Sequence, residues 1–201
     1  MIRFVLLCVT CAAVLATFSL IPLLGEDKID VKPSEGTVME QWKKLQQPGM
    51  EHQVLAKRAG SWLVTATCWK DGPNKPVTMA GNSEQRMVYD RYLTEEFSLG
   101  EGDSKMTGTG YIAFDNGNKC YEALYLGNMG TALCVLTGEH DTKTGELRLN
   151  SERTEKFLNN VKVKSRVLIT GIVGDKYIVN IYQTIGSQPE ARFMEMVYTR
   201  K

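Results

Sequence analysis

The sequence predicts one closed antiparallel β-barrel with short helices at its N-terminal end, and three observations carry this prediction. About ten short segments with β-type patterning follow one another at short spacing after Gly60. No segment shows the strand–helix–strand alternation of a parallel sheet. Trp62 lies on the first predicted strand and Arg200 on the last. Closure of a barrel brings these strands together, so the indole ring can meet the guanidinium.

The first 25 residues are interpreted as an export signal or a membrane anchor. Arg3 precedes an almost wholly apolar run from Phe4 to Leu24, and Glu26-Asp27-Lys28 ends the run. These features are typical of a cleaved signal peptide, but the run is also long enough to span a bilayer. In both cases Arg3 favours a cytoplasmic N-terminus. The predicted location is therefore exported, periplasmic or extracellular, or anchored with the domain on the non-cytoplasmic side.

Residues 26–36 form a polar linker, and residues 37–201 form the predicted barrel domain. Apolar residues recur at helical spacing from Thr37 to Gln46 and from Met50 to Ala59, and Pro48-Gly49 separates the two helices. We expect both helices to pack across one end of the barrel as a lid. On the second helix, His52 and Arg58 are expected on the more exposed side.

After Gly60 the apolar residues recur at every second position, as in Trp62, Val64, Ala66 and Cys68. Turn residues separate the segments, and Asn116-Gly117 is a strong hairpin signal because these residues tolerate positive φ. The predicted strands are Ser61–Lys70, Val77–Tyr89, Arg91–Ser98, Thr107–Phe114, Lys119–Leu126, Thr131–Glu139, Glu146–Ser151, Asn160–Gly171, Lys176–Gln183 and Ala191–Arg200.

The charge of the chain argues against nucleic-acid binding. The chain has 201 residues, with 24 Lys and Arg against 23 Asp and Glu. Arg3 is the only charged residue before Glu26, so the remainder is neutral. A neutral domain without a basic cluster has no sequence-independent grip on a polyanion.

Three cysteines remain outside the apolar run: Cys68, Cys120 and Cys134. An odd number in an oxidising compartment leaves at least one thiol unpaired. The spacing of Cys68 after Trp62 favours a small buried core residue. A disulfide between Cys120 and Cys134, expected on neighbouring strands, stays open because sequence does not give its geometry.

Known signatures of catalysis, metal binding and cofactor binding are missing from the sequence. It has two histidines, His52 and His140, and no His-Glu-x-x-His or Gly-x-Ser-x-Gly pattern. We expect no cofactor and no metal, and the scarcity of histidines argues against haem. Enzyme activity stays open but is the less favoured interpretation. His140, next to the turn at Asp141, is expected to be solvated.

Several motifs, in their order and spacing, resemble a bacterial family of uncharacterised lipocalin-like proteins, domain of unknown function 1579. The resemblance covers roughly Leu45 to Lys201. The motifs are Pro48-Gly49-Met50-Glu51-His52, Leu55-Ala56, Ala59-Gly60-Ser61-Trp62, Gly110-Tyr111, Phe114-Asp115-Asn116, Tyr121, Asn128-Met129-Gly130-Thr131, Thr137-Gly138 and Met194-Glu195-Met196-Val197-Tyr198-Thr199-Arg200. The resemblance implies a lipocalin-like, calycin-type barrel and no established reaction.

The sequence departs from that family at two places. Tyr89-Asp90-Arg91 stands where the family tends to have Gly-Gly-Arg, and only Arg91 is kept. Tyr125 and Gly127 stand where a Trp and an Asp are usual. If these positions line a pocket, it has lost an indole and a carboxylate, so the ligand differs or the site is vestigial.

The sequence predicts an exported barrel that binds a small apolar or amphipathic molecule. The alternatives are a structural or interaction barrel with a filled interior, because core and pocket share an aromatic lining, and a weak hydrolase or isomerase at the barrel mouth. A membrane is a predicted partner only through an uncleaved N-terminal segment. The candidate ligand-binding residues are His52, Tyr121, Tyr125 and Arg91. The candidate closure residues are Gly60, Trp62 and Arg200.

Overall fold

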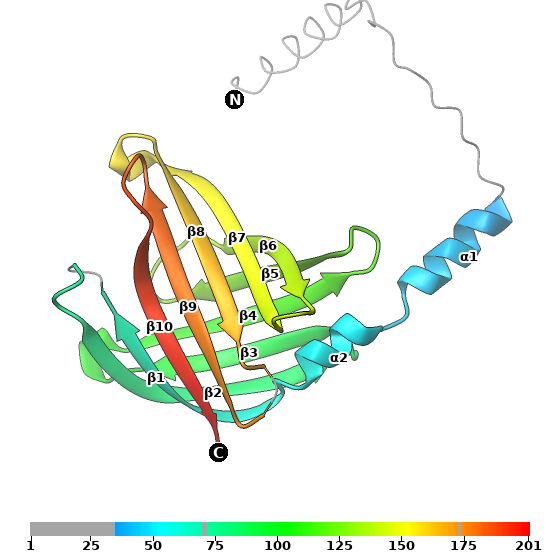
Figure 1. Cartoon of the computed structure of the whole chain (residues 1–201), viewed down its shortest axis with the longest axis horizontal. Coiled ribbons are helices and arrows are strands. Elements are labelled where there is room, and N and C mark those ends of the chain that lie inside the picture. The colour runs from blue at the N-terminus through cyan, green and yellow to red at the C-terminus, as the bar shows by residue number, and fades with distance from the viewer. Residues whose placement is uncertain (1–34, 70–71, 173) are drawn as a thin grey trace, which may run out of the picture. The chain divides into compact units, whose positions relative to one another are not determined.

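The computed structural model describes residues 35–69, 72–172 and 174–201 (Figure 1). The predicted export segment, residues 1–25, lies outside the described residues, as does most of the linker. No helix in the described part of the chain has the length and apolar character to cross a bilayer. The helices are α1 Glu35–Leu45 and α2 Met50–Ala56, with 3₁₀ turns at Gly102–Ser104 and Lys156–Leu158.

The strands are arranged as a closed antiparallel meander (Figure 1). Each strand pairs with its sequence neighbours, and β10 closes the barrel against β1, with Trp62 opposite Arg200. The predicted fold class is therefore confirmed. The strands are β1 Gly60–Cys68, β2 Val77–Val88, β3 Tyr92–Leu99, β4 Met106–Asp115, β5 Cys120–Gly127, β6 Cys134–Asp141, β7 Glu146–Glu155, β8 Val161–Thr170, β9 Lys176–Ile185 and β10 Ala191–Arg200.

Two strand boundaries differ clearly from the prediction. β6 begins at Cys134 rather than Thr131, because the β5–β6 loop continues past Gly130. β7 continues past Ser151 to Glu155 although its last residues are polar. Cross-strand pairing with β8, down to Glu155 opposite Val161, holds this polar extension in the sheet.

The core follows from the two-residue period of the strands. Trp62, Val64, Ala66 and Cys68 all point inward and are buried. Cross-strand register carries the same inward face around the barrel. Its most deeply buried large apolar members, with Leu55 of α2, are Leu93, Leu99, Tyr121, Leu136, Leu147, Leu149, Ile169 and Tyr177.

Helix α2 covers one end of the barrel, against β2, β3 and β4. Leu55 is completely buried there. The expected exposure of His52 and Arg58 is wrong, because both are buried. The helix ends at Ala56, so the chain turns at Lys57 and directs Arg58 inward. In α1, by contrast, Trp42 remains 56% exposed, so the lid observed on the barrel is α2.

Candidate ligand-binding site

Six inward-facing polar residues form a cluster beneath α2, called here the buried polar cluster. Because the strands are antiparallel, residues distant in the sequence reach this end of the barrel side by side. All six are nearly inaccessible to solvent. The members are Arg58 after α2, Ser83 and Gln85 of β2, Glu95 of β3, Tyr177 of β9 and Tyr198 of β10.

The carboxylate in this cluster is well supplied with donors. Oε1 of Glu95 accepts hydrogen bonds from Ser83 Oγ at 2.7 Å, Gln85 Nε2 at 3.0 Å and Tyr198 OH at 3.0 Å. Gln85 Nε2 also lies 2.5 Å from Tyr177 OH. Three donors on one oxygen compensate the loss of water around a buried carboxylate.

The guanidinium in the cluster has few hydrogen-bond acceptors. Arg58 is 1% exposed. Its Nη2 makes a long hydrogen bond to Tyr177 OH at 3.4 Å, and its Cζ lies 4.9 Å from the centroid of the Tyr177 ring. Nε and Nη1 of Arg58 are buried without an acceptor, and Gln85 Oε1 is buried without a donor. Burial opposes the charge of Arg58, but Tyr177, Tyr125 and Glu95 outweigh it and raise the guanidinium pKa above its usual value. Arg58 is therefore a charged group with open hydrogen-bonding capacity.

Aromatic rings connect this cluster to the seam between β1 and β10. Tyr177 stacks on Tyr198 at 4.3 Å between ring centroids, and Trp62 meets Tyr177 edge-on at 4.8 Å. Arg200 Cζ lies 4.2 Å from the Trp62 ring, and the Arg200 guanidinium donates to the carbonyls of Lys57 and Ala59. Gly60, between them, has a φ of +136°, and a Cβ there would collide with Arg200. The predicted closure residues thus lie together at the seam.

A second inward layer lies next to the cluster and has a different character. It faces the interior by register, yet each member keeps part of its surface accessible to solvent. Its rings lie against neighbouring strands over glycines: a Cβ on Gly110 would lie 2.5 Å from the Tyr125 ring, and one on Gly108 would lie 2.6 Å from the Phe97 ring. We call this the inner layer; its members are Phe97, Tyr125, Cys134, Ile181 and Met196.

Of the predicted ligand-binding residues, Tyr125 belongs to the inner layer, whereas His52 is part of α2 and Tyr121 is buried against that helix. His52 Nδ1 accepts the Gly49 N–H at 3.0 Å and so caps the helix. Burial, followed by the positive charge of Arg91, lowers the pKa of His52. With Nδ1 occupied and Cys68 at the opposite end of β1, the geometry does not favour His52 as the base of a Cys–His pair.

Tyr121 and His140 share one carboxylate of α2. Tyr121 OH donates to Glu51 Oε2 at 2.5 Å, and His140 Nδ1 lies 3.2 Å from the same oxygen. The side chain of His140 is only 11% exposed, so its expected solvation is wrong. Its place on β6, in the inward register with Leu136, overrides its closeness to the turn.

Arg91 lies in the β2–β3 turn. Its guanidinium donates to the carbonyls of Gln46 and Tyr89, which ties the segment between the helices to the turn. Tyr89 and Asp90 adopt φ of +54° and +55°. Positive φ angles are adopted more easily by glycine, which the family described above tends to have at these two positions, than by tyrosine. The structure therefore brings Arg91 to the chain before α2 and not to the inner layer.

The comparisons with known proteins identify the family. The family described as "Protein of unknown function (DUF1579)" matches residues 47–200. The chain belongs to the DUF1579 family. Its match covers α2, all strands and the whole buried polar cluster. No curated protein matches the chain.

Two solved structures resemble this DUF1579 barrel. Rv2717c from M. tuberculosis has a TM-score of 0.53 and 17% identity, over 77% of this chain and 99% of that chain. A redesigned beta barrel has a TM-score of 0.36 and 15% identity, over 74% of this chain and 95% of that chain. The first likeness shows the fold alone, and the second is too distant to carry an argument.

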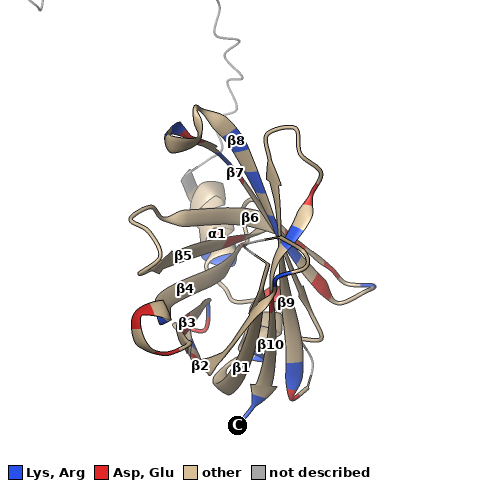
Figure 2. Cartoon of the chain, turned by 90° about the vertical axis from the view of Figure 1, so that its left-hand side faces the viewer, with Lys and Arg blue, Asp and Glu red and all other residues tan. Residues whose placement is uncertain are grey.

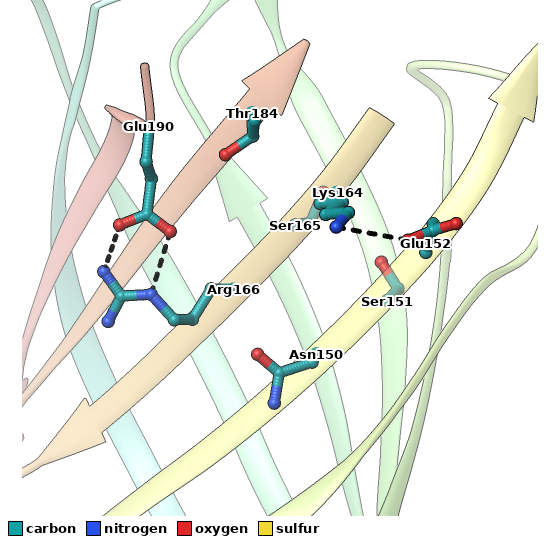
Figure 3. A pocket seen from close by; sticks show the side chains of 8 residues that line it. All are labelled: Asn150, Ser151, Glu152, Lys164, Ser165, Arg166, Thr184 and Glu190. Atoms are coloured by element: carbon teal, nitrogen blue, oxygen red, sulfur yellow. Dashed lines mark hydrogen bonds and ion pairs between the residues drawn. The ribbon is translucent and has the colours of Figure 1, made fainter. Parts of the chain in front are cut away.

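The outer wall of the DUF1579 barrel has a hollow of about 320 Å³ over β7, β8 and β9 (Figure 3). Lys and Arg residues follow one another along β8 (Figure 2). Figure 3 shows them paired within the hollow, Arg166 with Glu190 and Lys164 with Glu152. Its lining is Asn150, Ser151, Glu152, Lys164, Ser165, Arg166, Thr184 and Glu190. These internal pairs leave the hollow without an unpaired charge for a ligand.

Sequence reasoning missed the polar residues of the cluster. The signal for Glu95 is present, since Leu93, Glu95 and Phe97 alternate with outward residues on one strand. Ser83 and Gln85 similarly share a face with other inward positions of β2. In the part of the DUF1579 chain that the structure describes, no group of three or more His, Cys, Asp or Glu side chains could hold a metal ion.

Proposed function

We propose that the barrel binds a small apolar or amphipathic molecule in its interior, on the side of the buried polar cluster away from α2. In the cell, we propose that it does so on the non-cytoplasmic side, exported or anchored by its N-terminal segment. The observation that supports binding is the inner layer, whose inward-facing apolar groups remain partly accessible to solvent. A filled barrel would bury them.

The glycines of β4 supply the physical reason. Gly108 and Gly110 carry no side chain into the interior, and the Phe97 and Tyr125 rings use the space along the wall. Rings that lie along the wall leave the axis of the barrel less filled than rings that cross it. Covering the accessible apolar surface with a ligand is favourable by about 25 cal/mol per Å².

Titration of the full-length protein with the neutral fluorescent probe N-phenyl-1-naphthylamine tests this proposal. Cys134→Trp places an indole in the inner layer, whereas Val135→Trp places the same group on the outer wall, where Val135 is 59% exposed. We expect Cys134→Trp to weaken probe binding by about tenfold or more. Val135→Trp should bind as the parent does. Equal affinities in the two variants, or a parent that does not bind, would contradict the proposal.

The Cys134 thiol gives a readout that does not depend on the folding of a variant. Burial raises the pKa of this thiol, so its reactive thiolate is scarce at neutral pH. We expect a saturating concentration of the probe to slow the alkylation of Cys134 by iodoacetamide further. Peptide mass spectrometry measures the extent of alkylation. Cys120 serves as the internal control. Cys134 pairs with Tyr125 near the end of β5, whereas Cys120 lies at the start of that strand. Unchanged labelling of Cys134 would place the probe outside the barrel.

A further inference from the structure

The two buried charges of the polar cluster are satisfied very differently. Glu95 Oε1 accepts three hydrogen bonds, from a serine, a glutamine and a tyrosine. Arg58 has two of its three guanidinium nitrogens without an acceptor and a weak contact for the third. The free hydrogen-bonding capacity of the cluster is therefore mainly that of a buried cation.

A buried cation with unfilled hydrogen-bond donors is costly, because the protein must replace the hydration that the charge loses, and the ring and hydroxyl of Tyr177 replace it only in part. Arg58 does not escape this cost by losing its proton, since arginine stays charged in proteins. Glu95 favours the charge of Arg58 through its own negative charge, but no hydrogen bond or ion pair joins the two side chains, so Nε and Nη1 of Arg58 stay without an acceptor. The missing group is an acceptor, and an anionic acceptor compensates the charge best.

The inner layer leads to this cation. Tyr125 faces the interior over Gly110, and its phenol lies within side-chain hydrogen-bonding range of Arg58. Beside the cluster, Tyr198 OH contacts Met196 Sδ at 3.8 Å, and Met196 belongs to the inner layer. A molecule in the barrel would thus have apolar side chains along most of its length and the buried polar cluster at one end. One guanidinium matches one negative charge, which suits a carboxylate better than a doubly charged phosphate.

We propose that Arg58 binds the carboxylate of an amphipathic carboxylic acid whose apolar part lies along the inner layer. The inference rests on the proposed function and adds the chemical class of the ligand. Tyr125 is placed to donate a second hydrogen bond, because burial raises the pKa of its phenol and keeps it protonated. The open Gln85 Oε1 requires a donor, which a water beside the carboxylate supplies.

The test compares three ligands with the same tail, each displacing N-phenyl-1-naphthylamine from the full-length protein. We expect dodecanoic acid to bind about tenfold or more tightly than methyl dodecanoate, and dodecylamine to bind most weakly. The proposal is overturned if the ester binds as tightly as the acid, or if the amine binds more tightly. Equal binding of acid and ester is also the result expected if only water occupies the site next to Arg58. If neither the probe nor any ligand binds, the proposed function fails as well.

Two arginine variants locate the head group. Arg58→Met should remove the preference for the acid over the ester, with both affinities measured against the variant's own affinity for the probe. Arg153→Met is the control, because Arg153 shares the inward register of Leu149 at the end of β7 away from α2, is half exposed and is paired with Glu155. It should keep the preference. Loss of the preference in Arg153→Met instead would reverse the orientation of the ligand and overturn the proposal. If Arg58→Met does not fold, the comparison of acid and ester on the parent still decides.

Discussion

Glu95 and Glu96 are neighbours in the sequence with opposite environments, which shows how strongly the strand period acts on single residues. Glu95 faces inward and accepts hydrogen bonds from Ser83, Gln85 and Tyr198. Glu96 faces outward, with 66% of its side chain exposed and a long contact to Arg86. The same side chain is therefore part of the core at one position and a solvated surface group at the next.

We expect Glu95→Ala to lower the free energy of unfolding by about 3 kcal/mol or more, because three buried donors lose their acceptor. Glu96→Ala should change it by less than about 0.5 kcal/mol, since exposed ion pairs contribute little. Urea denaturation of the two variants measures the difference. Equal losses of stability would contradict the role of the buried carboxylate.

At the scale of elements, α2 is held in place by polar contacts as well as by Leu55. His52 accepts the Gly49 N–H at its start, and Glu51 accepts from Tyr121 and lies against His140. The chain before the helix is held by Arg91 and by Asn116, whose amide donates to the carbonyls of Leu45 and Gln47. A seven-residue helix is too short to be stable alone, so these contacts define the lid.

This arrangement predicts a pH dependence. The pKa of His52 is lowered from its ordinary 6.5, first by burial and then by Arg91, so folding favours the neutral imidazole. Its stabilisation is complete above the unfolded pKa and is lost as pH falls through the folded pKa. Between pH 7.5 and 5.5, the parent should therefore lose more stability than His52→Asn, whose amide oxygen keeps an acceptor for Gly49 without titrating. Urea midpoints at both pH values measure this difference, and parallel losses would rule out His52 as the source.

At the scale of the whole molecule, the seam between β1 and β10 closes the barrel and removes the free edges of the sheet. Trp62 is the largest side chain at this seam. It contacts Tyr177, Tyr198 and Arg200 and donates from Nε1 to the Arg58 carbonyl at 2.8 Å. One ring thus joins the seam, the buried polar cluster and the chain that follows α2.

We expect Trp62→Ala to lower the free energy of unfolding by about 3 kcal/mol or more, through the lost burial and the cavity. Leu63→Ala is the matched control on the outer face, where Leu63 is half exposed, and it should cost less than about 1 kcal/mol. Thermal or urea unfolding distinguishes them. A Trp62→Ala protein as stable as the parent would show that the seam does not depend on the indole.

The sequence predicts this architecture well because alternation with a period of two and turn residues act locally. It predicts the site less well because the site depends on where elements end. Arg58 is misassigned since the chain leaves the helix at Lys57, and His140 is misassigned since β6 extends two residues beyond its predicted end at Glu139. The unsatisfied hydrogen-bond donors of Arg58 depend on how side chains from β2, β3, β9 and β10 come together around it. No local sequence pattern contains that information.

Gly108 and Gly110, which lie against the rings of Phe97 and Tyr125, affect how much space remains inside the barrel without changing the order of its strands. Each ring rests where a neighbouring strand has no side chain. A methyl group gained at Gly110 would displace the Tyr125 ring toward the axis and shorten the longest guest that fits, whereas one at Gly108 would also collide with the Leu126 carbonyl and so disturb the strand itself. Within one unchanged framework of strands, a single substitution at Gly110 would therefore limit the size of the ligand.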